Sequence, residues 1–148
     1  MARSKFNVSK DTTKRTHNGI TFDSELEMKY YRDVVLPLVE KGKIITYELQ
    51  KKYELQPKFK KDGKTIKEIS YVADFFLVYE DGHEEVIDTK GCPDNIALMK
   101  RKMFWYHYPT IDYKWMSYSK IDGGWIEYEE LKKARKERKK AKQMIKGD

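Results

Sequence analysis

The sequence predicts a single α/β domain with a mixed central sheet and a basic helix at its C-terminal end. A chain of 148 residues that is 39% apolar and 14% aromatic can bury one core, but it is too short for two ordinary domains. Segments with helical and strand patterns follow one another as helix, strands, helix, strand, helix. Hairpin strands pair antiparallel, whereas a strand that follows a crossover helix can return parallel, so we expect both pairings in the sheet.

The expected organisation has three parts: a flexible basic arm over residues 1–19, a folded domain over 20–127 and a basic helix over 128–148. The arm is polar, lacks any period and ends at the turn-forming pair Asn18–Gly19. The final segment has helical propensity but is basic nearly all round, so it cannot be a core helix over its whole length.

The net charge of +7 is concentrated at the two ends of the chain. Residues 131–148 contain nine Lys or Arg against two acids, and residues 1–20 contain five against one, which leaves 17 bases and 21 acids over 21–130. Basic ends around an acidic middle suit an enzyme that binds nucleic acid and holds divalent cations in its cleft. The alternative is that the basic tail is a solvated end that aids solubility.

The first helix is predicted over the segment ELEMKYYRDVVLPLVEKG. Asp23 or Ser24 can cap its N-terminus, and Gly42 can close its C-terminus. Pro37 is expected to kink this helix or to stop it early, because proline lacks the backbone N–H that the helix needs.

Alternating apolar and polar residues predict the strands that follow. ITYELQKKYELQ and PKFKK are interpreted as one or two strands that run into a Lys-Asp-Gly turn at 61–63. Residues 69–79 give the strongest strand signal, being rich in β-branched and aromatic side chains. Asp81–Gly82 then separates this strand from EEVIDTK, which predicts a hairpin.

The remaining elements are a second helix, a strand and the final helix. In IALMKRKMFWYHY the apolar residues Ile96, Met99, Met103 and Tyr106 recur at helical spacing, and the helix should stop before Pro109. Residues 111–118 read as a strand, and Gly123–Gly124 breaks the chain before a helix from about Tyr128 to Lys146. Most of the aromatic residues, such as Tyr31, Tyr71 and Trp115, fall at core positions.

Charged residues inside the apolar hairpin strands predict a site. Asp74 lies in YVADFFLV, and Asp88 and Lys90 share one face of EVIDTKG. Two carboxylates that meet on adjacent strands repel each other unless a cation lies between them, and oxygen ligands suit Mg²⁺. This pairing requires an odd-length loop or a β-bulge, because a two-residue Asp81–Gly82 turn would place the two aspartates on opposite faces.

The first helix is expected to contribute a third carboxylate. At 100° per residue, Glu27 lines up with Tyr31, Val34 and Leu38 in the apolar stripe, whereas Glu25 lies on the solvent side. An acid on the buried face either reaches the cleft of the two aspartates or is costly to the fold, and we expect the first.

The order FDSELE, YVADF, VIDTKG and KRK resembles the PD-(D/E)XK nuclease superfamily, and within it a family of phage-encoded endonuclease-like proteins, over about Gly19 to Tyr118. The resemblance implies a restriction-endonuclease-like αβββαβ core. It also implies that Asp74 and Asp88-Thr89-Lys90 form the signature motif, with Ala73 in place of the motif's proline. Glu27, Asp74, Asp88 and Lys90 would be catalytic, and the Thr89 carbonyl would join the three acids as a metal ligand. Lys100 and Lys102 would face phosphates.

The hypothesis is a Mg²⁺-dependent DNA endonuclease, with Mn²⁺ able to substitute, acting as a homodimer on branched DNA like a Holliday junction resolvase in phage recombination or replication. The alternatives are a restriction-like or homing-type endonuclease on duplex DNA, and a non-catalytic nucleic-acid-binding module. Phosphate contacts in the basic tail are assigned to Arg135, Lys136 and Lys139.

No segment approaches the length needed to span a bilayer, and the N-terminus lacks the apolar stretch of a signal peptide. We therefore expect a protein without a membrane partner that is cytoplasmic, in the host cell if it is phage-encoded. Its one cysteine, Cys92, excludes an internal disulfide and is interpreted as a buried filler residue. The three histidines lack metal-ligand spacing.

Overall fold

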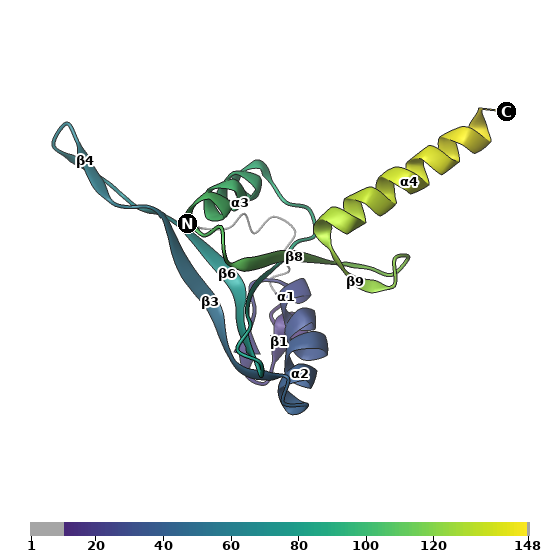
Figure 1. The fold of residues 1–148 in the computed structure, drawn as a ribbon, viewed down its shortest axis with the longest axis horizontal. Helices are drawn as coiled ribbons and strands as arrows, with labels where there is room; N and C mark the ends of the chain where they lie inside the picture. Colours follow the sequence, from purple (N-terminus) through teal and green to yellow (C-terminus); the bar gives the residue numbers. More distant parts are fainter. Residues whose placement is uncertain (1–10, 148) are drawn as a thin grey trace.

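The computed structural model describes residues 11–147, which form a mixed α/β fold around a five-stranded sheet (Figure 1). In chain order its elements are η1, a 3-10 turn (Thr13–Arg15), β1 (Thr16–His17), β2 (Ile20–Thr21), α1 (Glu25–Tyr30), η2, a π-helical segment (Tyr31–Val35), α2 (Leu36–Glu40), β3 (Ile44–Gln56), β4 (Phe59–Lys61), β5 (Lys64–Ile66), β6 (Ile69–Tyr79), β7 (Glu84–Thr89), α3 (Asn95–His107), β8 (Asp112–Ser119), β9 (Gly124–Glu127) and α4 (Tyr128–Lys146).

The sheet has the strand order β3-β6-β7-β8-β9 and contains both pairings. The hairpin strands β6 and β7 pair antiparallel, and β8 pairs parallel to β7 because the crossover helix α3 lies between them. The α/β class and the mixed sheet expected from the sequence are therefore confirmed. β9, which pairs antiparallel with β8, was not predicted, since Gly123–Gly124 was interpreted as a plain break before the last helix.

Two cores lie on opposite faces of this sheet. Ile87 belongs to the core that packs under α1 and α2, and its neighbour Val86 belongs to the core that packs under α3. Successive residues of a strand point to opposite faces, so the two sets of helices cover opposite sides of β7. The aromatic residues expected in the core are buried there, with Tyr31 in the first core and Tyr71 in the second.

Pro37 neither stops nor breaks the first helix. The chain passes from α1 through the π-helical segment η2 into α2, and Pro37 occupies the first turn of α2. A π-helical turn shifts the hydrogen-bond pattern by one residue, which accommodates a residue that has no N–H to donate. Glu25 is exposed and pairs with Lys29 at 3.5 Å, as the helical phase predicts.

The buried face of α3 differs from the predicted stripe. Ile96, Met99 and Tyr106 are 46%, 51% and 81% exposed, whereas Phe104 is fully buried. Phe104 is the centre of a ring cluster that includes Tyr53, with the ring centroids 5.1 Å apart. Met103, the fourth residue of the predicted stripe, is partly buried against the same core, so packing around Phe104 turns the other three towards solvent.

Two further expectations need correction. Residues 13–19, assigned to the flexible arm, form the turn η1 and the first part of the β1–β2 hairpin, and Arg15 Nη1 donates to the carbonyl of Phe22 at 2.9 Å. Residues 1–10 of the predicted arm lie outside the described residues. Cys92 is exposed on the loop before α3 and is not a buried filler. Over residues 11–147, the described helices include none that is long and apolar enough to cross a membrane.

The buried tyrosines should make stability sensitive to alkaline pH. Burial raises the pKa of Tyr71 and Tyr113 above the ordinary value of 10.0, and the negative charge of Asp88 raises both further. The unfolded chain then ionises first, so stability is complete below about pH 10 and is lost as pH rises above it. The free energy of unfolding should fall by roughly 1.4 kcal/mol per pH unit for each such tyrosine.

Urea unfolding at a series of alkaline pH values tests this expectation. Tyr71→Phe should reduce the slope, whereas Tyr106→Phe, at an exposed position, should not. An unchanged slope for Tyr71→Phe would contradict it.

Candidate active site

The loop of the β6–β7 hairpin has three residues, which meets the odd-length condition set by the sequence. The last ladder pairs near the turn are Leu77 with Glu85 and Val78 with Glu84, and the Tyr79 N–H donates to the His83 carbonyl at 2.8 Å. Glu80, Asp81 and Gly82 therefore form the loop, with Gly82 in the left-handed region at φ 86°. Asp74 and Asp88 consequently occupy facing positions on the two strands.

The regular ladder between β6 and β7 ends at Phe75 and Ile87, one position before the two aspartates. Beyond this pair the carboxylates replace backbone carbonyls as acceptors. Asp88 Oδ1 accepts from the Asp74 N–H at 3.3 Å, and Asp74 Oδ2 accepts from the Thr89 N–H and hydroxyl at 2.8 and 2.9 Å. Both carboxylates are buried, so the hairpin holds two acids side by side in its interior.

Lys90 follows directly after β7 and returns to the site. Its Nζ lies 2.6 Å from Asp88 Oδ2 and 5.1 Å from the ring centroid of Trp115, with 15% of the side chain exposed. Its backbone is fixed on both sides, because its N–H donates to the Met116 carbonyl and the Ser117 hydroxyl donates to its carbonyl. These backbone hydrogen bonds to β8 hold Lys90 in place, with its ammonium beside the pair of carboxylates.

Glu27 is buried on α1, as its helical phase predicts. Ser24 caps this helix by accepting from the Glu27 N–H at 3.1 Å, which fixes where the helix begins. The Glu27 side chain reaches β3, where Gln50 Nε2 donates to its Oε2 at 3.1 Å. Gln50 lies between the pairs that join Leu49 to Phe75 and Lys51 to Ala73, so it is opposite Asp74 in the sheet.

Gln50 was missed by the sequence analysis. It adopts φ 55° inside a strand, a conformation that is uncommon for a residue with a side chain and that is often found at functional sites. Leu49 packs in the α1 core and Tyr53 in the α3 core, so the odd-numbered residues of β3 change faces across Gln50. The one signal in the sequence is Lys51, which interrupts an otherwise apolar series of odd positions.

The charges of this group favour a cation. Glu27, Asp74 and Asp88 are each at most 1% exposed, and with Lys90 they formally total −2. Buried carboxylates are costly unless they are paired or bind a metal, and three oxygen-donor side chains are the ligands that Mg²⁺ prefers. The donor set therefore fits a divalent cation, for which the resemblance would add the Thr89 carbonyl.

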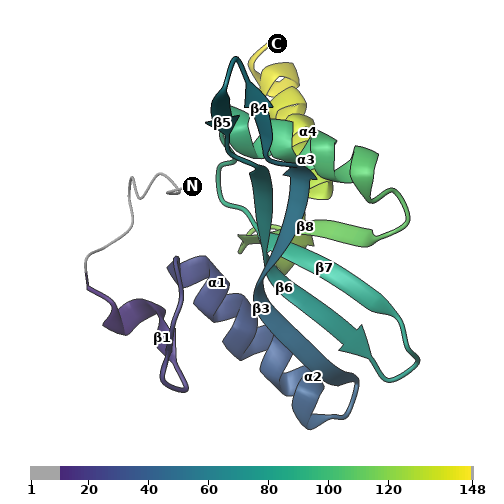
Figure 2. The same cartoon turned by 90° about the vertical axis from the view of Figure 1, so that its left-hand side faces the viewer.

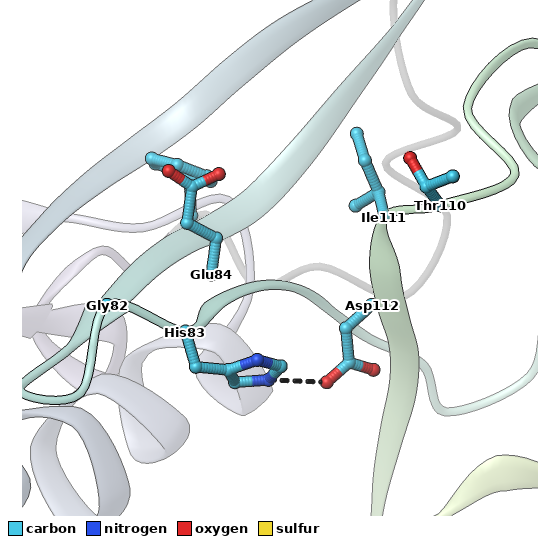
Figure 3. A pocket seen from close by; sticks show the side chains of 7 residues that line it. Gly82, His83, Glu84, Thr110, Ile111 and Asp112 are labelled. Carbon is cyan, nitrogen blue, oxygen red and sulfur yellow. Dashed lines mark hydrogen bonds and ion pairs between the residues drawn. The ribbon is translucent and has the colours of Figure 1, made fainter.

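A different trio meets the distances of a metal site over residues 11–147. His83, Glu85 and Asp112 bring one ligand atom each within 4.8 Å of one another, whereas the carboxylates of Glu27, Asp74 and Asp88 turn towards Gln50, backbone N–H groups and Lys90. Figure 3 shows His83 at the hairpin tip pointing towards Asp112, beside a cleft of about 370 Å³.

The existing contacts of this trio satisfy its charges without a metal. His83 Nε2 is 2.8 Å from Asp112 Oδ2, and Lys114 Nζ is 2.7 Å from Glu85 Oε2 and 3.7 Å from Asp112. The Tyr79 hydroxyl also donates to Glu85, so each of these side chains already has a partner within the protein. We interpret the trio as a structural network at the start of β7 and β8.

The residues expected to face phosphates are distributed over two helices. Lys100 points at the sheet, where its Nζ donates to the Ser70 carbonyl at 2.8 Å, and Lys102 is exposed on the outer side of α3. Arg135, Lys136 and Lys139 are exposed on α4. The structure therefore leaves four of these five side chains accessible. The fifth, Lys100, contacts β6, the strand that carries Asp74.

An aromatic and cationic stack beside Lys90 was also missed. The guanidinium of Arg101 lies 4.2 Å from the ring centroid of Trp115 and 4.7 Å from that of Trp105, and Glu129 of α4 binds it at 2.9 Å. Only the fold brings these residues together, since they come from α3, β8 and α4.

The fold and the site together define an α/β protein with a buried cluster of carboxylates and a lysine, where a hairpin in its central sheet stops pairing. Residues 3–124 match the model of a family described as a protein of unknown function, DUF1064, and the chain belongs to that family. The matched residues include every member of the cluster and end before α4 begins. No curated protein and no solved structure matches the chain.

Proposed function

We propose that this protein is a metal-dependent DNA endonuclease whose active site consists of Glu27, Asp74, Asp88 and Lys90. The observation that carries the proposal is the pair Asp74 and Asp88, which are buried on facing positions of a hairpin with Lys90 2.6 Å from Asp88. A stable fold gains little from burying like charges together, and such groups are concentrated at functional sites.

The order of elements around the site supports this proposal. The helix α1–α2 is followed by the sheet strands β3, β6 and β7, then by α3 and β8. This is the αβββαβ order of the restriction-endonuclease-like core that the PD-(D/E)XK resemblance implies. The motif residues lie on the elements that the resemblance assigns to them, with Glu27 on the first helix and Asp74 and Asp88 on adjacent strands.

The chemistry follows from the donor set. A Mg²⁺ ion held by Asp74, Asp88, Glu27 and the Thr89 carbonyl would act as a Lewis acid towards a phosphodiester and lower the pKa of a water molecule. The Lys90 ammonium, which lies 2.6 Å from Asp88, would stabilise the negative charge that develops on the phosphate.

Gln50 would hold Glu27 in position through its amide, because its backbone conformation aims the side chain across the sheet at α1. Mn²⁺ should replace Mg²⁺, since it accepts the same oxygen ligands. The substrate that we favour is branched DNA of the four-way-junction type, cut by a homodimer, with plain duplex as the second candidate.

A cleavage assay on duplex, flap and four-way-junction DNA tests the proposal. We expect cleavage with Mg²⁺ or Mn²⁺ that stops when EDTA is added, and fastest cutting of the branched DNA. Light scattering of the active fraction shows whether the working species is the dimer that symmetrical cutting requires. Binding to DNA without cleavage under every metal would instead favour a non-catalytic nucleic-acid-binding module.

A further inference from the structure

The segment 57–68, which we call the basic ribbon, projects from the sheet without packing on it. It contains the two-stranded sheet β4–β5, and every residue in it is exposed. Figure 1 shows the ribbon leaving the molecule on one side while α4 leaves on the other, and Figure 2 shows both at the end that holds α3. The two extended basic elements thus diverge from the same end of the fold.

Local geometry, and not burial, keeps the basic ribbon folded. Asp62 and Gly63 both have positive φ, at 50° and 75°, which defines the tight turn that matches the twist of paired strands. Phe59 and Ile66 face each other across the two strands and shield each other at its base. The chain therefore maintains a projection that contributes nothing to either core.

The charge of the basic ribbon is unfavourable in the protein alone. It contains five lysines against two acids, and one of those acids, Glu68, already pairs with Lys52 at 3.7 Å. Lys61 and Lys64 lie directly opposite each other next to the turn. Like charges at facing strand positions destabilise a hairpin, and a polyanion placed against them removes that repulsion.

The position of the basic ribbon relates it to the proposed active site. Its strands continue β3 and β6 beyond Gln50 and Asp74, and Gly63 lies eleven positions before Asp74. At about 3.3 Å per residue the tip can reach roughly 36 Å from Asp74, which is about one turn of a DNA duplex. A two-stranded ribbon is also narrow enough to enter the major groove.

We propose that the basic ribbon binds the phosphate backbone of a DNA duplex about one helical turn from the scissile phosphate, an inference that rests on the proposed function. Lys61 and Lys64 are its principal contacts. They add affinity without reading sequence and offset the repulsion between DNA and the acidic centre of the protein.

The double variant Lys61→Gln/Lys64→Gln, in the full chain, tests the inference. Binding of a fluorescently labelled duplex is measured by anisotropy in EDTA at several salt concentrations, so that cleavage plays no part. The slope of log affinity against log salt should shrink by about 1.8, and the affinity at low salt should fall on the order of tenfold. A single strand of the same sequence should be affected less than the duplex.

The matched control is Lys41→Gln/Lys43→Gln, which removes two exposed lysines at the opposite end, beyond α2. It should leave the slope within experimental error of the parent protein. If the ribbon variant has the slope of the parent, or if the parent does not bind the duplex, the inference is wrong. A parent protein that binds through the ribbon but never cleaves would retain the ribbon's contact with duplex phosphates and overturn the proposed endonuclease.

Discussion

Asp88→Asn is expected to abolish metal-dependent cleavage while leaving the protein at least as stable as the parent. The side chain is fully buried and faces Asp74, so the amide would relieve a repulsion that offsets the loss of its ion pair with Lys90. Loss of a metal-binding carboxylate should lower the cleavage rate by at least about 10³-fold. The free energy of unfolding should stay within about 1 kcal/mol of the parent value or rise, as is common when a strained functional site is neutralised.

Glu85→Gln is the matched control, because Glu85 is another buried carboxylate on the same strand. Its oxygen atoms accept from the Tyr79 hydroxyl at 2.8 Å and from Lys114 at 2.7 Å, so it belongs to the structural network and not to the proposed site. This change should cost about 1.5–3 kcal/mol of stability, since it weakens a hydrogen bond between charged groups. Cleavage by the folded protein should remain near that of the parent.

The effect of Mg²⁺ on the free energy of unfolding tests the site without measuring cleavage. An ion that binds the folded protein alone should raise its unfolding free energy by about 2.7 kcal/mol at a hundred times its dissociation constant. Urea unfolding should show this increase for the parent and for Glu85→Gln, and not for Asp88→Asn. Equal stabilisation of all three proteins would mean that the ion binds elsewhere, and His83, Glu85 and Asp112 would then be the first residues to vary.

The site could be predicted from the sequence as far as local periodicity determines it. The alternation of side chains along a strand placed Asp88 and Lys90 on one face, and the helical repeat placed Glu27 on the buried side of α1. The pairing of Asp74 with Asp88 could be stated as a condition only, because the residues Glu80 to His83 are compatible with turns of different lengths. The structure resolves that choice through the hydrogen bond between Tyr79 and His83.

The features that sequence could not predict depend on contacts between distant segments. The left-handed conformation of Gln50 is imposed where β3 crosses from one core to the other, and no propensity of glutamine indicates it. The orientation of α3 is set by Phe104 within its ring cluster, so Met103 faces the core as predicted, whereas Ile96, Met99 and Tyr106 are exposed. The basic ribbon was recognised as a strand and a turn, but its lack of any packing partner appears in the fold alone.

Lys90→Met should separate catalysis from metal binding. Methionine keeps much of the length of the side chain and removes the ammonium, which is 2.6 Å from Asp88 and 5.1 Å from the ring centroid of Trp115. The loss of a preorganised positive group should slow cleavage by about 10² to 10³-fold. Magnesium should still stabilise the variant, and at a lower concentration than for the parent, because the ion no longer competes with an ammonium for Asp88.

Lys90→Arg is the conservative comparison for this residue. Arginine retains the positive charge, but its guanidinium is larger and planar and cannot take the position of the ammonium beside Asp88. We therefore expect a cleavage rate between that of the parent and that of Lys90→Met. Single-turnover cleavage and magnesium titration of unfolding, measured on the same preparations, give both quantities. If Lys90→Met cleaves as fast as the parent, the lysine neutralises Asp88 in the folded protein and has no part in the reaction.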